Sequence, residues 1–246
     1  VLVRSCMLDF GRFEAFTLDC YGTLVDWERG LLAALALVRA RAARPMDDAA
    51  LIARYGALEA ALEAPGANGS HRAYRAIVEE IGRTLAGEMG VAMSDAEAAA
   101  FGASVGEWPA FDETPAALRS LASRFRLFVV SNVDDDLFAR TRERLGRRED
   151  GRSVIEDAIT AQRCGSYKPS LNNFRAALER IGLPRERVLH VAASIYHDIA
   201  PARAMGLATV WVNRGARMPG HQRTEETPDL EVPDLATLTR LACAAT

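Results

Sequence analysis

The sequence predicts an α/β fold in which helices flank a parallel sheet and a mainly helical segment interrupts the sheet after its first strand. Residues 15–20 form a short apolar run, typical of a buried strand, that ends at a carboxylate. Residues 26 to about 108 carry only helical patterns, rich in Ala, Leu, Glu and Arg. From residue 111 onward, helix and strand patterns alternate, which indicates a parallel sheet. We therefore expect a catalytic core made of residues 1–25 and 110–246, and a helical cap domain at 26–109.

Within the insertion, Pro45 and the turn-rich stretch at 65–70 separate the helical patterns. Ser94 and Glu97 have the spacing of a capping box, which marks the start of the last helix. The predicted helices of the insertion are 31–44, 48–64, 71–88 and 94–106.

In the core, each β-branched or apolar run alternates with an amphipathic one. The predicted strands after the first are 127–131, an extended piece at 155–161, 187–192 and 208–212. The predicted helices are 115–124, 136–145, 171–181 and 198–205. Asp134, Asp135 and Asp136 resemble a metal-binding cluster, but a cap for the helix at 136–145 is the simpler interpretation.

Composition excludes several classes of protein. The net charge is -3, and the arginines alternate with acidic residues instead of forming blocks, so no nucleic-acid partner is expected. No apolar run approaches the ~20 residues of a membrane span, and no secretory signal pattern opens the chain. The four cysteines form no CxxC pair, which favours reduced thiols and a cytoplasmic location.

Lysine occurs once, at Lys168, among 30 basic residues. An ammonium group is a compact point charge that the wide planar fork of arginine cannot replace in a tight pocket. An arginine-biased composition with one remaining lysine would also explain the count. The neighbourhood of Lys168 favours a functional role.

Polar side chains follow four of the predicted strands. These are Asp19, then Ser131 with Asn132, then Lys168, and finally the segment from Ser194 to Asp198. In open parallel sheets, ligands bind beyond the carboxyl ends of the strands, so we expect these residues to meet at one edge.

These four segments resemble the four motifs of the haloacid dehalogenase-like superfamily, in order and in spacing, over about residues 15–240. The motif residues are 16–26, 130–132, 167–169 and 190–198. The resemblance implies a Rossmann-like core, a helical cap and an aspartate nucleophile at Asp19. Most members are magnesium-dependent phosphatases with acids where this chain has Tyr21 and Ala193. The segment around Tyr21 is instead similar to the 2-haloacid dehalogenase branch, which implies no metal ion and no cofactor.

The resemblance implies a mechanism in which Asp19 displaces a leaving group, halide in this branch, from the α-carbon of a small carboxylic acid, with inversion. Water then hydrolyses the aspartyl ester to give a 2-hydroxy acid. Lys168 and Thr23 would position Asp19, with Lys168 lowering its pKa, and Asp198 would direct the water. The residues expected to bind the substrate are Tyr21, Ser131, Asn132, Ser194 and Phe174.

Arg54 matches, by motif context, the cap arginine that receives the leaving anion. It shares a helical stripe with Leu51, Leu58 and Leu62, where a charge must be paired or face a cleft. The alternative is an arginine that extends from the margin of the stripe into water.

Phe174, Ala193 and Ile195 stand where characterised dehalogenases have polar side chains, which leaves other functions open. These are opening of a strained ring such as azetidine-2-carboxylate, a phosphatase with a degenerate metal site, and a catalytically silent binding protein. The branch is often dimeric, so a homodimer is a further possibility.

Overall fold

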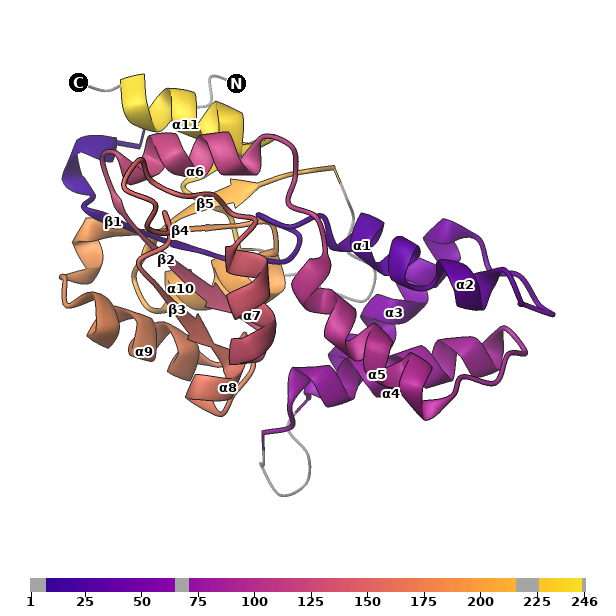
Figure 1. Cartoon of the computed structure of the whole chain (residues 1–246). Helices are drawn as coiled ribbons and strands as arrows, with labels where there is room; N and C mark the ends of the chain where they lie inside the picture. The colour runs from indigo at the N-terminus through magenta and orange to yellow at the C-terminus, as the bar shows by residue number, and fades with distance from the viewer. Residues whose placement is uncertain (1–7, 65–70, 216–225, 245–246) are drawn as a thin grey trace, which may run out of the picture.

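The computed structural model describes residues 8–64, 71–215 and 226–244, and it contains a parallel sheet in the order β3-β2-β1-β4-β5-β6 (Figure 1). The predicted α/β class and the five predicted strand positions are confirmed. The strands are β1 (Ala15–Leu18), β2 (Arg126–Ser131), β3 (Asp157–Thr160), β4 (Val188–Ala192), β5 (Ala208–Val212) and β6 (Leu230–Val232). The sequence did not predict β6, because three residues are too few to establish a period.

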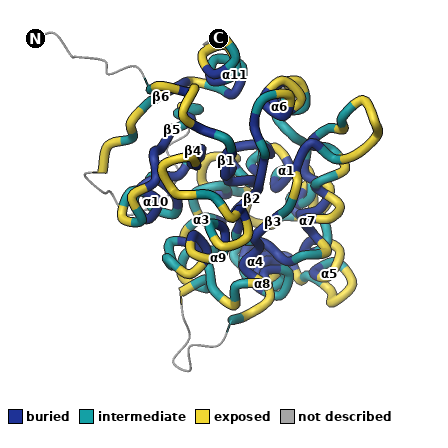
Figure 2. Tube along the Cα trace, turned by 90° about the vertical axis from the view of Figure 1, so that its left-hand side faces the viewer, coloured by how far each residue is buried: buried dark blue, intermediate teal, exposed yellow. Residues whose placement is uncertain are grey.

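Helices cover both faces of the sheet, as the alternating pattern requires (Figure 1). On one face, α6 (Thr114–Ala122) and α11 (Leu235–Ala244) pack over Phe16 and Leu18. On the other face, α9 (Leu171–Ile181) and α10 (Ala200–Ala204) pack over Ala15 and Val130. Successive strand residues point to opposite faces, so both cores need apolar side chains, and the central strands β1, β2 and β4 are buried along nearly their whole length (Figure 2). Two shorter helices, α7 (Asp135–Arg142) and α8 (Ala161–Cys164), follow β2 and β3.

The segment between β1 and α6 is helical, as predicted, and extends to one side of the sheet (Figure 1). Its helices are α1 (Trp27–Ala34), α2 (Ala36–Arg39), α3 (Asp48–Glu63), α4 (Tyr74–Glu88) and α5 (Asp95–Ser104). The single helix predicted at 31–44 is wrong: the chain leaves helical geometry at Leu35 and divides into α1 and α2. The predicted capping box of Ser94 and Glu97 is present at the start of α5.

The two connections between the sheet and these helices run side by side. Val25 and Ala110 form an antiparallel bridge, and the backbone N–H of Asp26 donates to the carbonyl of Pro109 at 2.8 Å. The chain thus enters and leaves the inserted helices through one paired junction, next to the end of β1.

Asp134 adds a second tie between the two parts. Its carboxylate accepts hydrogen bonds from the backbone N–H groups of Tyr74 and Arg75, both at 2.9 Å. It therefore caps α4 of the insertion, whereas its side chain makes no capping hydrogen bond to α7. Asp134 stands at the N-cap position of α7, as predicted, and Asp135 and Asp136 lie in the first turn of that helix. The expected capping hydrogen bond to α7 is absent, because the Asp134 carboxylate bonds the start of α4 instead.

We expect Asp134→Ala to lower the free energy of unfolding by about 1–2 kcal/mol, since two N–H groups of α4 lose their acceptor. Urea denaturation followed by circular dichroism measures this change. Asp136→Ala is the control, because Asp136 is exposed and its ion pair with Arg75 lies at the surface. Equal losses in the two variants would contradict the capping role.

No helix among the described residues is long and apolar enough to cross a membrane. Cys20, Cys164 and Cys243 are free thiols, and Cys6 lies outside the described residues.

Candidate active site

The predicted strand-end residues meet in a cavity that encloses about 460 Å³ of atom-free space, part of it open to solvent. The cavity lies beyond the carboxyl ends of β1, β2 and β4, where parallel sheets bind ligands. Side chains from α3 and α4 of the insertion form its other wall. Its lining residues are Asp19, Tyr21, Glu59, Glu63, Tyr74, Ser131, Asn132, Lys168, Ser194, His197 and Asp198.

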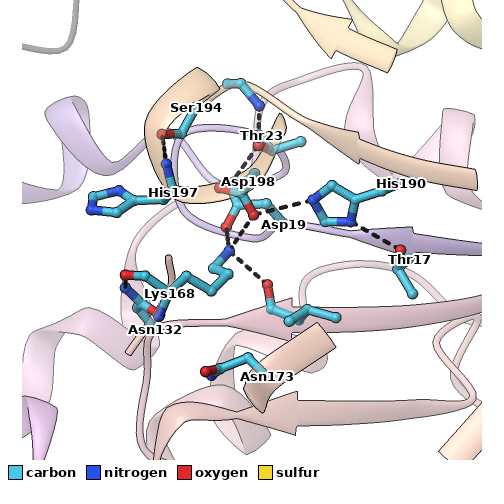
Figure 3. A network of polar contacts seen from close by, with 12 residues as sticks. Thr17, Asp19, Thr23, Asn132, Lys168, Asn173, His190, Ser194, His197 and Asp198 are labelled. Atoms are coloured by element: carbon cyan, nitrogen blue, oxygen red, sulfur yellow. Dashed lines mark hydrogen bonds and ion pairs between the residues drawn. The ribbon is translucent and has the colours of Figure 1, made fainter. Parts of the chain in front are cut away.

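Lys168 is the centre of the polar network (Figure 3). Its Nζ donates to Asp19 Oδ1 at 2.8 Å, to Asp198 Oδ1 at 2.6 Å and to the carbonyl oxygen of Val130 at 2.8 Å. The side chain is only 2% exposed. An ammonium group has three N–H donors, so these three acceptors use all of them. The only lysine of the chain thus joins the two strand-end carboxylates.

The local backbone brings Lys168 to this place. Helix α8 ends after one turn at Gly165, whose φ of +63° belongs to the left-handed region that favours glycine. Asn132, at the end of β2, then holds the backbone of Lys168: its Oδ1 accepts from the Lys168 N–H at 2.7 Å, and its Nδ2 donates to the Lys168 carbonyl at 3.2 Å.

The pKa values of the two aspartates that share the Lys168 ammonium shift in opposite directions. Burial alone would raise the pKa of Asp198, but Lys168 and His190 outweigh burial and hold this pKa at about 2. Burial raises the pKa of Asp19, and the pull of Lys168 does not reverse that shift. Burial would lower the pKa of Lys168, yet the two carboxylates raise it, so the ammonium stays protonated. Lys168 thus lowers the pKa of Asp19, as expected, but burial outweighs this effect and the net shift of Asp19 is upward, whereas the pKa of Asp198 is lowered.

Thr23 orients the other oxygen of Asp19. Its hydroxyl donates to Asp19 Oδ2 at 2.6 Å and accepts from the backbone N–H of Ala193 at 2.9 Å. Both oxygens of Asp19 are therefore engaged by groups that are themselves held in place. This arrangement fixes the orientation of the carboxylate.

His190 extends the network into the sheet and was not among the predicted site residues. Its Nε2 lies 3.2 Å from Asp198 Oδ1, and its Nδ1 lies 2.9 Å from the hydroxyl of Thr17 (Figure 3). The sequence signal was weak, since a lone histidine in an apolar strand is usually a core residue. Asp198 itself lies in a π-helical turn, Ile195–Ile199, and not at the start of an α-helix as predicted.

The insertion contributes two carboxyl groups that the prediction also missed. Glu59 accepts a hydrogen bond from Tyr74 Oη at 2.5 Å, and Glu63 accepts one from Asn132 Nδ2 at 2.9 Å. Burial is the largest cause that raises the pKa of Glu59 to about 7 and raises that of Glu63 well above its usual range. Their spacing of four residues places both on one face of α3, which was the available signal.

Four of the five predicted substrate-binding residues line the cavity, and they differ in the hydrogen-bond partners of their side chains. The hydroxyl of Tyr21 lies 2.8 Å from Thr141 Oγ1. The side-chain amide of Asn132 donates hydrogen bonds to Glu63 and to the carbonyl of Lys168. The hydroxyl of Ser194 accepts one from the backbone N–H of His197. The buried hydroxyl of Ser131 has no hydrogen-bond partner within the described structure.

Phe174 does not reach the cavity. It lies in the core beneath the sheet, 1% exposed, with its ring 5.2 Å from that of His190. The placement expected from motif position was wrong, because α9 turns this side chain towards the sheet.

Arg54 does not reach the cavity either. Its guanidinium is 43% exposed and pairs with Glu88 at the end of α4, with an Nη2–Oε1 distance of 2.6 Å. Tyr55, not Arg54, is the buried side chain of this turn of α3. The expectation that Arg54 faces the cleft was wrong, and the alternative of an arginine at the stripe's margin describes its position.

The comparisons with known proteins agree with this fold. A family model for haloacid dehalogenase-like hydrolases matches residues 13–206. The fold is similar to that of the L-2-haloacid dehalogenase PA0810, with a TM-score of 0.77 and 23% identity over 94% of this chain and 99% of that one. It is also similar to the L-2-haloacid dehalogenase of Xanthobacter autotrophicus with chloropropionic acid covalently bound, with a TM-score of 0.78 and 18% identity over 95% and 100%.

A shorter segment of this chain is similar in sequence to a phosphatase. The glyceraldehyde 3-phosphate phosphatase of Methanocaldococcus jannaschii is 37% identical over 61 residues, which cover 25% of this chain and 27% of that enzyme. The aligned segment thus spans about a quarter of that relative's length.

Proposed function

This chain belongs to the haloacid dehalogenase-like hydrolases, and from this we propose that it hydrolyses a bond at the α-carbon of a small carboxylic acid. Asp19 is the nucleophile, an aspartyl ester is the intermediate, and a 2-hydroxy acid of inverted configuration is the product. No metal ion and no cofactor takes part. Halide is the leaving group to test first, because the similar structures are named as dehalogenases.

In the first step, Oδ of Asp19 attacks the α-carbon from the side opposite the leaving group, which departs with the bonding electrons. Lys168 and Thr23 hold the carboxylate in one orientation through hydrogen bonds of 2.8 and 2.6 Å. Such positioning lowers the barrier because the reacting atoms need no further ordering.

In the second step, water attacks the ester carbonyl carbon of Asp19, and the hydroxy acid leaves. Asp198 directs this water, since it lies on the other side of the Lys168 ammonium and stays ionised at neutral pH, with a pKa of about 2. The covalently bound chloropropionic acid of the Xanthobacter autotrophicus relative supports a covalent intermediate.

The observation that carries this proposal is the position of the ammonium, between Asp19 and Asp198. A magnesium ion bound by the same two oxygens, Asp19 Oδ1 and Asp198 Oδ1, would have to displace that ammonium. Among the described residues, no group of three or more His, Cys, Asp or Glu side chains is arranged to hold a metal ion. The described residues therefore do not fit magnesium.

Isotope labelling tests the intermediate. In a single turnover of L-2-chloropropionate with excess enzyme, in ¹⁸O-water with EDTA, we expect the label in the peptide that contains Asp19 and none in the lactate. Mass spectrometry of the peptide and of the product measures both. Label found only in the lactate would mean that water attacks the carbon directly, and the proposal would be wrong.

A magnesium-dependent phosphatase is the second candidate, favoured by the local similarity to the phosphatase of Methanocaldococcus jannaschii. Hydrolysis of p-nitrophenyl phosphate that requires magnesium and is lost in Asp19→Asn would support it. We expect no such hydrolysis.

A further inference from the structure

The cavity of the candidate active site carries more acidic than basic side chains. Of its described lining residues, Asp19, Glu59, Glu63 and Asp198 have carboxyl groups, whereas Lys168 is the single lysine and no arginine is among them. The Lys168 ammonium has all three N–H groups engaged, and two of them donate to Asp19 and Asp198. Within the described residues, Lys168 thus forms ion pairs with the two aspartates, and neither glutamate forms one with a lysine or an arginine.

Glu59 and Glu63 face the cavity from one side of α3. They lie one helical turn apart, both are partly buried, and each accepts a hydrogen bond from an uncharged group, Tyr74 Oη for Glu59 and Asn132 Nδ2 for Glu63. A carboxylate offers about four sites to hydrogen-bond donors, so each glutamate can accept more. Removing two neighbouring carboxylates from water is costly unless a positive charge joins them. The pair is therefore suited to a cationic group of a ligand.

Two tyrosines add aromatic rings to the same cavity. Tyr21 and Tyr74 both line it, and their hydroxyls are already used, by Thr141 and by Glu59. The ring of Tyr21 packs edge-on against Trp108, with ring centroids 5.9 Å apart. The face of an aromatic ring attracts a cation that lies within about 6 Å of its centroid. Carboxylates and aromatic rings in one cavity favour a positively charged ligand for two separate physical reasons.

Ser131 is an independent indication that a ligand binds here. It is 1% exposed, it lines the same cavity, and its hydroxyl has no hydrogen-bond partner among the described residues. A buried hydroxyl without a partner costs free energy, which a ligand that accepts its hydrogen bond would recover. The next residue, Asn132, bonds Glu63, so this hydroxyl and the two glutamates border the same space. The cavity therefore offers a donor for a carboxylate and acceptors for a cation.

We propose that Glu59 and Glu63 form a subsite for a protonated amine of the substrate, and that Ser131 donates to the substrate carboxylate. The substrate class is then a small 2-substituted carboxylic acid with an ammonium group on its chain beyond the α-carbon. This ammonium takes no part in the displacement and remains in the product. The inference rests on the proposed attack by Asp19 at the α-carbon and adds a second charge to the substrate. The raised pKa values of both glutamates agree with it, since a bound cation would favour the ionised forms that burial disfavours.

Three ligands with equal numbers of non-hydrogen atoms test the subsite: 4-aminobutyrate, 4-hydroxybutyrate and pentanoate. None has a leaving group at the α-carbon, so calorimetry measures their binding to the wild-type protein, with EDTA present. We expect 4-aminobutyrate to bind about 10²-fold more tightly than either of the others, the effect of a well-placed charge pair. The hydroxy acid separates the effect of charge from that of hydrogen bonding, and pentanoate has neither at this end.

The variants assign the two ends of the ligand. Glu59→Gln and Glu63→Gln should each weaken binding of 4-aminobutyrate about 10-fold or more and leave that of pentanoate within about 3-fold, because glutamine keeps the shape but not the charge. Ser131→Ala should weaken all three ligands alike, by about 10-fold, because the carboxylate is common to them. Glu88→Gln, in the surface ion pair with Arg54, is the matched control and should change none of them. Circular dichroism confirms the folding of each variant.

The outcomes separate this inference from the proposed function. Equal affinity for the three ligands, or no measurable binding of 4-aminobutyrate, would overturn the inference and leave the attack by Asp19 to the isotope experiment. Binding of magnesium ions that Glu59→Gln abolishes, with no preference for the amine, would assign the glutamates to a metal ion and would overturn it as well. Amine preference that both glutamine variants remove, together with an Asp19 peptide that gains no ¹⁸O, would support the subsite and contradict the proposed function.

Discussion

Lys168→Met should lower kcat by about 10³-fold or more, because the substitution removes the charge that holds two carboxylates in one geometry. The methionine keeps most of the side-chain volume but leaves Asp19 and Asp198 without their common donor. Asp198 loses the main cause of its low pKa, so one of the two acids takes up a proton at neutral pH. Steady-state kinetics on the preferred substrate measures the loss.

The same substitution should also destabilise the fold by about 3–5 kcal/mol, the usual cost of leaving a buried charge without its partner. Adding Asp198→Asn to Lys168→Met should recover part of that stability, since one buried carboxylate is then gone, but none of the activity. Lys168→Arg tests shape as well as charge, and we expect it to be nearly inactive, because the guanidinium fork cannot occupy the space of an ammonium bound on three sides. Full activity in Lys168→Arg would show that only the charge matters.

Asp19→Asn should reduce turnover about 10⁴-fold or more, since an amide oxygen cannot form the ester. Stability should change by less than about 1 kcal/mol, because Lys168 then keeps a single carboxylate partner, Asp198. This separation of activity from stability distinguishes a nucleophile from a structural residue. Turnover rates and urea denaturation of the same preparation give both values.

Thr23→Val should reduce turnover less than Asp19→Asn does. It keeps the shape of the side chain, removes the 2.6 Å bond to Asp19 and leaves the N–H of Ala193 without an acceptor. We expect a loss of about 10- to 10²-fold, as for a group that positions the nucleophile but does not react. A loss in Thr23→Val as large as that in Asp19→Asn would contradict these assigned roles.

Much of this protein follows from local patterns. Alternation of helix and strand predicted the parallel sheet, and the rule that ligands bind at the carboxyl ends of strands placed Asp19, Ser131, Asn132, Lys168 and Asp198 at one edge. That rule succeeds because every strand of the sheet points the same way. The break between α1 and α2 was not predicted, because the composition of the segment is uniformly favourable to helix and the departure at Leu35 is small.

The insertion was predicted less well in detail, for a physical reason. A helix with many apolar and charged residues can bury different faces, and the partner that it packs against decides which. In α3, burial of Tyr55 turned Arg54 outward to Glu88 and turned Glu59 and Glu63 towards the cavity. The wall that α3 contributes is therefore acidic and not cationic as expected.

The sequence alone determined the sheet, the place of the helical insertion, and which residues stand at the strand ends, because periodicity and chain direction are local properties. Only the tertiary structure decided that one ammonium joins Asp19 and Asp198, that His190 supports Asp198 from within the sheet, and that two glutamates complete the cavity. Those features depend on distances between side chains far apart in the sequence, and such distances are set by how the insertion and the sheet pack together.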